Sequence, residues 1–289
     1  MKNINDLIAI LDLEQLSENT FKGISKTIGS PNVFGGQVAA QALNAAYRTV
    51  QENRFVHSLH SYFLRPGNLL KPILFEVENL RDGRSFSTRR VTALQDDKAI
   101  FIMAASFQIV EDGHDYQKEI ITDIAQPEDL LSWTEMVDKY EDILPKPMLS
   151  YLSIDRPVEF KPTQILNPFE QKDLPATEDV WFKLKGTIPS NISLPLKHQL
   201  LAYISDYPIL NAVLKPHGSK AHYGNTQMAS LDHSMWFYRD FNFDDWMLFT
   251  AEAPNTFGAR GFSRGNIFSR DGKLIASVAQ EGLMRPKTY

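Results

Sequence analysis

Apolar residues follow a helical spacing in one early segment of the chain and a strand-like spacing in the four that come after it. The segment 33–51 is rich in small residues, including Ala39, Ala42 and Ala46, and predicts a helix that a sheet can approach closely. The four runs that follow are rich in Val, Ile, Phe and Thr and predict strands. These runs lie at about 55–65, 71–80, 84–95 and 98–110. The first part of the chain therefore reads as a helix followed by an antiparallel meander.

The same order of elements recurs in the second part of the chain. A helix is predicted over about 194–215, and four strand-like runs follow it. These runs lie near 227–239, 245–254, 258–269 and 273–284. Short matches join the two parts at offsets of 172, 173 and 174 residues, respectively Ser58-Leu59 with Ser230-Leu231, His60-Ser61 with His233-Ser234, and Arg90 with Arg264. The recurrence indicates a tandem duplication.

A polar, proline-containing stretch separates the repeated parts. It covers 112–155, with a short helical pattern near 128–144, and we interpret it as a connector. The predicted organisation is an N-terminal half at 1–111, this connector, and a C-terminal half at 156–289. Each half should form an antiparallel sheet of about four to six strands wrapped round its own helix, an α+β arrangement. If the sheets join edge to edge, one continuous sheet covers both helices and hides two edges.

Composition narrows the class of protein. With 43% hydrophobic and 22% charged residues among 289, the chain has the make-up of a globular protein. No run approaches the roughly 18 consecutive apolar residues of a membrane helix. Residues 1–16 lack the basic start and the cleavage site of a signal peptide, so we expect a surface helix there. These features predict a cytoplasmic protein with no membrane partner.

Charge and cysteine content bear on the chemistry that the chain can carry. The sequence has no cysteine, which removes disulfides, thiolate metal sites and a cysteine nucleophile. A net charge of -5 argues against nucleic-acid binding, because nucleic-acid-binding proteins normally carry a basic face. Arginine suits phosphate recognition, and four arginines lie within ten residues, namely Arg81, Arg84, Arg89 and Arg90. This cluster is a candidate phosphate contact, although exposed strands also carry arginine for solubility.

Three patterns imitate functional motifs without their context. Residues 261–265 spell G-x-S-x-G around Ser263, but the serine-hydrolase motif needs a following helix and a later histidine, and the sequence offers neither. His57 and His60 lie three apart on a predicted strand, so we expect them on opposite faces and not at one metal ion. The acidic cluster within 240–245 reads as a solvated turn. We therefore predict no metal site and no cofactor.

Four segments of the chain together resemble a known family. They are VFGGQVAAQAL (33–43), HSLHSYFLRPG (57–67), RDGRSFSTRRV (81–91) and SLDHSMWFYR (230–239). In this order they are similar to the type II acyl-CoA thioesterases, the TesB-like enzymes that also include peroxisomal members. The resemblance extends from about residue 5 to about residue 285. It implies a double hotdog, in which two tandem hotdog halves each wrap an antiparallel sheet round a central helix.

The resemblance also implies a catalytic group in the second half. Carried over by motif, the acid of YISD is Asp206, the hydroxyl residue before LDHSMWF is Ser230, and the glutamine of AQEG is Gln280. Family members carry Thr or Ser at the middle position, so Ser230 stays within the pattern. The first half has no acid at the matching part of its helix, where Gly35 and Gly36 lie. The first half is therefore expected to be structural or to shape the substrate site.

These three side chains suit thioester hydrolysis by an activated water. We hypothesise that Asp206 takes a proton from the water while Ser230 and Gln280 hold it in line, because a hydroxyl and a carboxamide offer both donors and acceptors. A thiol has a pKa of about 8.5 and leaves without a strong general acid. Backbone N–H groups at a helix end would stabilise the oxyanion. A covalent anhydride at Asp206 is the variant mechanism.

The predicted function is hydrolysis of fatty acyl-CoA, broad and of medium to long chain, to a free fatty acid and coenzyme A. One alternative is a hotdog dehydratase or hydratase that depends on His198, eight residues before Asp206. The other is an acyl-CoA-binding protein that has no turnover. Because hotdog proteins commonly pair their sheets, a homodimer or homotetramer is expected.

Overall fold

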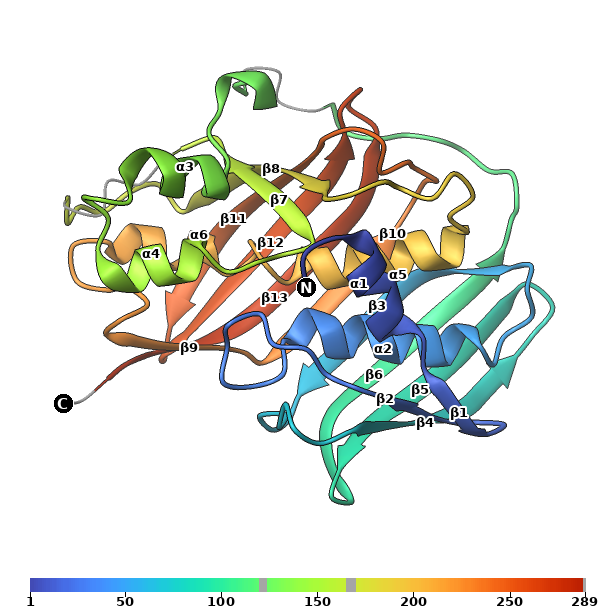
Figure 1. The fold of residues 1–289 in the computed structure, drawn as a ribbon. Coiled ribbons are helices and arrows are strands. Elements are labelled where there is room, and N and C mark those ends of the chain that lie inside the picture. Colours follow the sequence, from blue (N-terminus) through green and yellow to red (C-terminus); the bar gives the residue numbers. More distant parts are fainter. Residues whose placement is uncertain (120–123, 165–169, 288–289) are drawn as a thin grey trace.

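The computed structural model describes residues 1–119, 124–164 and 170–287 (Figure 1). The first half consists of α1 (Ile4–Leu11), β1 (Glu14–Ser17), β2 (Thr20–Gly23), α2 (Gly35–Tyr47), β3 (Arg54–Phe63), β4 (Ile73–Asp82), β5 (Phe86–Gln95) and β6 (Lys98–Ile109). The second half consists of β7 (Val158–Pro162), β8 (Thr177–Leu184), α5 (Leu194–Ser205), α6 (Asn211–Leu214), η2 (Lys215–His217), β9 (Thr226–Ser230), β10 (Asp232–Phe237), β11 (Met247–Phe257), β12 (Arg260–Ser269) and β13 (Leu274–Pro286).

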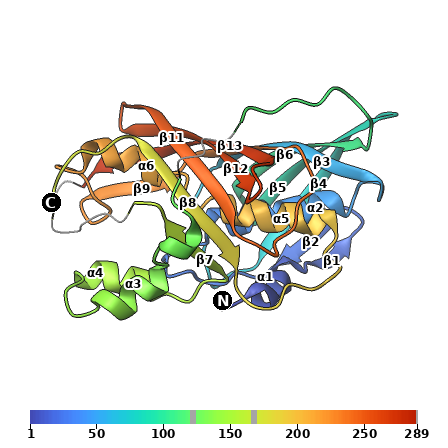
Figure 2. The same ribbon diagram turned by 90° about the horizontal axis from the view of Figure 1, so that it is seen from above.

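One continuous antiparallel sheet runs through both halves. Its strand order is β1-β2-β4-β5-β6-β3-β10-β13-β12-β11-β8-β7, with β9 paired to β13 outside this path. Read outward from the middle, the two halves repeat the same succession, and β3 pairs antiparallel with β10 at the join. Figure 2 shows α2 and α5 on the same side of this sheet, with its β1–β2 and β7 edges curling round them. The predicted double-hotdog arrangement is confirmed.

The composition of α2 follows from its place beneath the sheet. Its alanines are completely buried, and their small side chains let the strands approach the helix backbone closely. Gln41 is buried as well, but its Nε2 donates to the carbonyl of Ile10 at 2.7 Å and to that of Ile24 at 2.9 Å. The buried amide is thereby satisfied, as burial of a polar group requires.

Two cross-strand ion pairs occupy equivalent positions in the two halves of the chain. Glu78 lies opposite Arg90 on the β4–β5 pair, and Glu252 lies opposite Arg264 on the β11–β12 pair. In each pair the arginine Nε donates to the glutamate at 2.7 Å. Both members of the second pair follow those of the first by 174 residues. The offset of 174 is therefore structurally meaningful.

The match of His60 with His233 at an offset of 173 is not a structural correspondence. His60 is exposed on β3, whereas His233 is fully buried on β10. Side chains alternate between the two faces of a strand, so a match that departs by one residue from the structural offset of 174 joins residues on opposite faces. The expectation from this match was wrong for that reason.

Two predicted elements of the second half are each broken in two. The helix expected over 194–215 ends at Ser205, and the chain turns before α6, because Pro208 has no N–H and disfavours a helical residue before it. The strand expected over 227–239 is interrupted at Leu231, which separates β9 from β10. Both interruptions fall beside residues of the candidate site.

The connector packs on the second half, and the N-terminal helix contacts both halves. The connector forms η1 (Pro127–Asp129), α3 (Trp133–Tyr140) and α4 (Lys146–Leu152), while its residues 120–123 lie outside the described part. The Trp133 ring lies 4.7 Å from that of Phe160 on β7. In α1, one face is buried in the core and the N–H of Ile4 donates to the carbonyl of Lys185 at 2.9 Å, so the expected surface helix is only half exposed.

Candidate active site

Asp206 lies where the C-terminus of α5 packs beside the N-terminus of α2, because the two central helices run antiparallel and side by side. It is the C-cap residue of α5, where the carbonyl end of the helix dipole disfavours a negative charge. Its carboxylate instead faces the amino end of α2, and the N–H of Gly36 donates to Oδ2 at 2.8 Å. The charge is thus held by the N-terminus of a helix from the other half of the chain.

Two glycines make this approach of the helices possible. A Cβ at Gly35 would lie 2.7 Å from Asp206 Oδ2 and 2.8 Å from Cε1 of Phe63. A Cβ at Gly36 would lie 2.4 Å from the backbone carbonyl oxygen of Tyr203 on α5. The requirement is therefore close approach and not an unusual backbone conformation. The N–H of Gly35 has no protein acceptor in the described part of the chain, which leaves it available to a ligand.

Ser230 and Gln280 reach the same carboxylate from two neighbouring strands. Ser230 ends β9, and its Oγ lies 3.3 Å from Asp206 Oδ1. Gln280 is fully buried on β13, and its Nε2 lies 3.1 Å from Asp206 Oδ1 and 2.8 Å from Ser230 Oγ. The structure therefore brings together the three residues that the sequence resemblance singles out.

The break at Leu231 is what turns Ser230 toward this cluster. His233 and Met235 on β10 are buried beneath the sheet, and in an unbroken strand a residue three positions before His233 would face the other way. At the break the N–H of Leu231 donates to Glu281 and its carbonyl accepts from Phe63, both at 2.9 Å. The break shifts the alternation of side chains along the chain, so Ser230 lies on the same face of the sheet as Gln280.

The surroundings of Asp206 act on its pKa in opposite directions. Burial raises the pKa of this carboxyl above its ordinary value. The charge of His233 and the hydrogen bonds from Gln280, Gly36 and Ser230 act against that rise. All three bonds are donated to the carboxylate oxygens, so they fit the ionised form. The result is a carboxylate more basic than an exposed one, which is the property that a general base needs.

Sequence reasoning missed two contributors to this cluster. The Gly36 N–H comes from the half expected to be structural or substrate-shaping, and only the packing of α2 against α5 reveals it. His233, on β10, contacts the carboxamide of Gln280. In the sequence His233 is a polar residue three positions after Ser230, within the resembling segment 230–239. That its side chain points beneath the sheet, toward Gln280, depends on the strand break at Leu231.

Other histidines and Ser263 lie outside this cluster. His198 is about 12 Å from Asp206 along α5, at 1.5 Å per residue, and its Nδ1 lies 2.7 Å from the hydroxyl of Tyr47. Burial lowers the pKa of His198 to about 3. Ser263 is buried on β12 and donates to the carbonyl of Glu252 at 3.0 Å, which confirms that its motif does not form a nucleophile elbow.

The prediction that His57 and His60 point to opposite faces is wrong. His57 Nε2 lies 2.8 Å from Ser106 Oγ, and His60 Nδ1 lies 3.1 Å from Ser234 Oγ, both on the outer face of the sheet. The register of β3 against β6 shifts between Val56 and Ser58, which marks a bulge at His57. The extra residue changes the alternation along the strand, so both rings lie on one face.

The arginine cluster lies away from the candidate site. Arg89 is buried and its Nε donates to Thr49, just beyond the C-terminus of α2, whereas Asp206 meets the N-terminus of that helix. The 13-residue helix is about 20 Å long, so any phosphate bound by this cluster would lie far from Asp206. Arg90 is also bound to Glu78 by two bonds of 2.7 Å.

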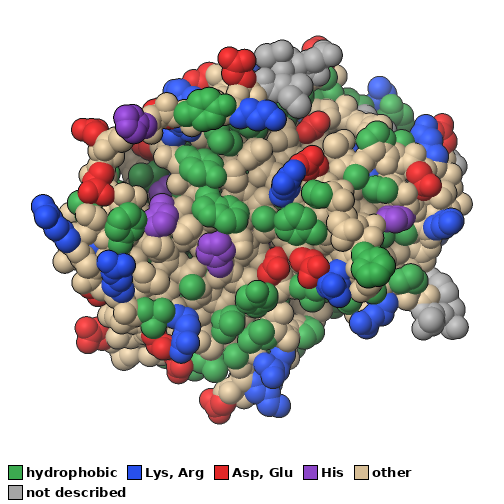
Figure 3. All heavy atoms as spheres, turned by 180° about the vertical axis from the view of Figure 1, so that it is seen from behind, with side chains coloured by type: hydrophobic (Ala, Val, Ile, Leu, Met, Phe, Trp, Pro, Cys, Tyr) green, Lys and Arg blue, Asp and Glu red, His purple; other side chains and the backbone are tan. Residues whose placement is uncertain are grey.

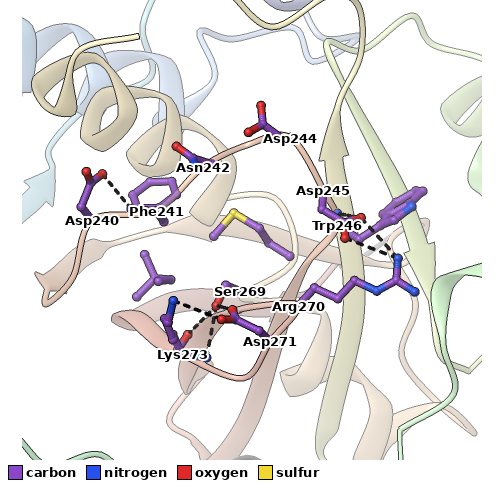
Figure 4. A pocket seen from close by; sticks show the side chains of 12 residues that line it. Asp240, Phe241, Asn242, Asp244, Asp245, Trp246, Ser269, Arg270, Asp271 and Lys273 are labelled. Atoms are coloured by element: carbon purple, nitrogen blue, oxygen red, sulfur yellow. Dashed lines mark hydrogen bonds and ion pairs between the residues drawn. The ribbon is translucent and has the colours of Figure 1, made fainter. Parts of the chain in front are cut away.

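A pocket of about 530 Å³ lies elsewhere, between the 240–247 loop and the 269–273 turn (Figure 4). Its mouth precedes β13, about 20 Å along that strand from Gln280. Asp245 pairs with Arg270 and Asp240 with Lys197.

Among the described residues no cluster of three or more His, Cys, Asp or Glu side chains is arranged to hold a metal ion, and no helix is long and apolar enough to cross a membrane.

Comparisons with known proteins identify the family to which the chain is similar. Residues 24–108 match the family model described as the acyl-CoA thioesterase N-terminal domain, and residues 150–283 match the one described as acyl-CoA thioesterase. The chain is 41% identical to acyl-CoA thioesterase 2 of Haemophilus influenzae over 98% of each chain. It is 39% identical to acyl-coenzyme A thioesterase 8 of Mus musculus, over 96% of this chain and 88% of that protein. A solved acyl-CoA thioesterase II from Mycobacterium marinum superimposes with a TM-score of 0.78, at 35% identity and 98% coverage of each chain.

Proposed function

The chain belongs to the acyl-CoA thioesterase family, and on that premise we propose that it hydrolyses fatty acyl-CoA to a free fatty acid and coenzyme A. In this proposal Asp206 is the general base, assisted by Ser230 and Gln280. The observation that supports these roles is the convergence of both side chains and the Gly36 N–H on one carboxylate. The family membership supports the reaction, and the cluster supports the assignment of residues.

The proposed reaction begins with a water between Asp206 and the thioester. Asp206 removes a proton from the water as its oxygen attacks the carbonyl carbon, while Ser230 and Gln280 orient the water through the same atoms that now contact the carboxylate. The negative charge that develops on the carbonyl oxygen is stabilised at the N-terminus of α2, where the Gly35 N–H is available. Collapse of the intermediate breaks the carbon–sulfur bond and releases the thiolate, which takes up a proton as coenzyme A.

The apolar neighbours of the site support a fatty acyl chain as the substrate group. The Phe63 ring lies beside Gly35, and the Phe34 ring lies 4.4 Å from that of Tyr207, next to Asp206 in sequence. On the far side of the cluster, Leu210 packs against Gly282, two residues after Gln280. Such walls favour an alkyl chain over a polar acyl group. We propose a broad preference for medium to long chains.

Two further properties are proposed from the sequence. We infer a cytoplasmic location, and a homodimer or homotetramer in solution. Figure 3 shows apolar and histidine side chains gathered over the middle of the outer face of the sheet. Tyr62 and Tyr238 contribute to this face with 58% and 48% of their surface exposed. An apolar face of this kind supports self-association through the sheet.

The experiment that tests the proposed activity measures release of free coenzyme A from a series of acyl-CoAs, from short to long. Rates that rise toward medium and long chains would support the whole proposal. A 3-hydroxyacyl-CoA added to the series tests the alternative, since an enoyl product formed from it by loss of water would support a dehydratase, a reaction that the distance of His198 from Asp206 disfavours. Tight binding without release would indicate an acyl-CoA-binding protein.

A single turnover in heavy-oxygen water tests the mechanism. Direct attack by water leaves the label in the fatty acid and none in the protein. A covalent anhydride at Asp206 would be hydrolysed with label entering the carboxylate of Asp206. Mass spectrometry of the peptide that contains Asp206 distinguishes the two routes, and label in that peptide would overturn the general-base mechanism.

A further inference from the structure

A buried histidine stands behind the candidate site and uses both of its ring nitrogens. His233 lies on β10 with no exposed surface. Its Nδ1 contacts Oε1 of Gln280, and its Nε2 lies 2.9 Å from Ser205 Oγ. Ser205 immediately precedes Asp206, so these contacts close a ring from α5 through β10 and β13 back to α5.

A count of hydrogen atoms fixes the direction of the Gln280 carboxamide. The two hydrogens of its Nε2 are directed to Asp206 Oδ1 and to Ser230 Oγ. Its Oε1 is an acceptor and therefore needs a donor, which must be a protonated Nδ1 of His233. If the carboxamide were reversed, Oε1 would face the carboxylate of Asp206, and two acceptors would repel each other.

The Ser205 hydroxyl is compatible with a hydrogen on Nδ1 of His233 whether the ring is neutral or charged. When the ring is neutral, the Ser205 hydroxyl donates to Nε2 and leaves the hydrogen on Nδ1. When the ring is charged, Nε2 donates to Ser205, whose hydroxyl then donates to the carbonyl of Ala202 at 3.0 Å. Nδ1 carries a hydrogen in both states.

We propose that His233 is a positioning residue that holds the Gln280 carboxamide with its NH₂ toward Asp206 and Ser230. This role rests on the proposed function, because it acts through the group that orients the attacking water. His233 itself touches neither the water nor the substrate. Its effect is to prevent Gln280 from adopting the reversed orientation, in which the carboxamide oxygen would face the carboxylate of Asp206.

A set of substitutions at His233 separates this role from simple filling of the core. His233→Leu removes both ring nitrogens, and it should lower kcat roughly tenfold or more with little change in KM, because the acceptor of Gln280 loses its donor. His233→Asn offers an amide near the position of Nδ1 and should recover much of the lost kcat. His233→Gln offers an amide near Nε2 only and should not. Thermal melting of each variant identifies those that are folded.

A double-mutant cycle provides the second readout. If His233 acts through Gln280, adding His233→Leu to Gln280→Leu should lower kcat no further. Equal rates for His233→Asn and His233→Gln, a wild-type kcat in folded His233→Leu, or additive losses in the cycle would each overturn the proposal. If Asp206→Asn is inactive while folded His233→Leu is fully active, only the positioning role fails. If Asp206→Asn keeps its rate, the proposed base itself fails.

Discussion

Among single residues, Asp206 stands out because its half-buried carboxylate must be ionised to act as a base. The carboxylate receives hydrogen bonds from Gly36, Ser230 and Gln280, and each of these stabilises the charged form and lowers the pKa. Burial acts in the opposite direction and prevails, so the pKa lies above that of an exposed aspartate. Catalysis by the ionised form should therefore weaken as pH falls through this raised pKa.

Removal of one donor should move the acid side of the pH–rate profile in a known direction. Ser230→Ala deletes a hydrogen bond to the ionised form of Asp206, which raises the pKa further, by up to about one unit. The acid limb of kcat/KM should shift to higher pH by that amount, together with a loss of rate.

A matched control for this substitution is Ser277→Ala. Ser277 lies on β13 like Gln280, but its hydroxyl donates to Asn266 at 2.6 Å and not to the candidate site. Its profile should follow that of the wild type. An acid limb of Ser230→Ala that stays in place or moves to lower pH would contradict the assigned hydrogen bond.

At the scale of elements, the close packing of α2 against α5 depends on glycine. Gly36→Ala should destabilise the fold by about 1–3 kcal/mol, since its Cβ would collide with a backbone carbonyl that cannot rotate away. Thermal or denaturant unfolding measures this loss. Gly113→Ala is the control, because a Cβ there meets nothing within 4 Å. Equal stability of the two variants would show that the helices can separate at no cost.

The elements also show how much of the architecture the sequence can predict. Periodicity located α2 and the four strands after it, together with most of their counterparts in the second half. It did not reveal the interruption of the second helix, although Pro208 was a visible reason for the helix to end before it. It also missed the break at Leu231, because backbone bonds to Glu281 and Phe63 create that break and both partners are distant in sequence.

The candidate site was less predictable than the fold. Asp206, Ser230 and Gln280 were found only through family resemblance, because no spacing rule relates residues on a helix end and two strands. Gly36 and His233 could not be found in that way, since their roles arise from contacts between segments far apart in the chain. The direction of His233 in particular depends on the phase change at Leu231, which alternation along an ideal strand does not predict.

At the scale of the whole molecule, the site belongs to both halves even though its side chains come from one. The N-terminus of α2 supplies a backbone donor to Asp206, so both halves of the chain contribute to the candidate site. The outer face of the shared sheet is the other whole-molecule feature, and it bears on assembly.

The proposed self-association can be tested on that outer face. Wild-type protein should sediment as a dimer or tetramer, and Tyr62→Glu should shift it to smaller species by placing like charges in the contact. Tyr116→Glu changes a side chain that is 89% exposed in the 112–119 segment and serves as the control. A wild-type monomer at micromolar concentration would contradict the proposal.

Asp206 is the proposed base of a thioester hydrolysis. The most direct measurement compares coenzyme A release from one medium-chain acyl-CoA by the wild type, Asp206→Asn and Asp244→Asn. Asp244 is an exposed acid on the far pocket, so its variant should keep the wild-type rate. We expect kcat to fall about 100-fold or more in folded Asp206→Asn, as loss of a general base requires. Equal rates in the wild type and folded Asp206→Asn would show that Asp206 is not the base.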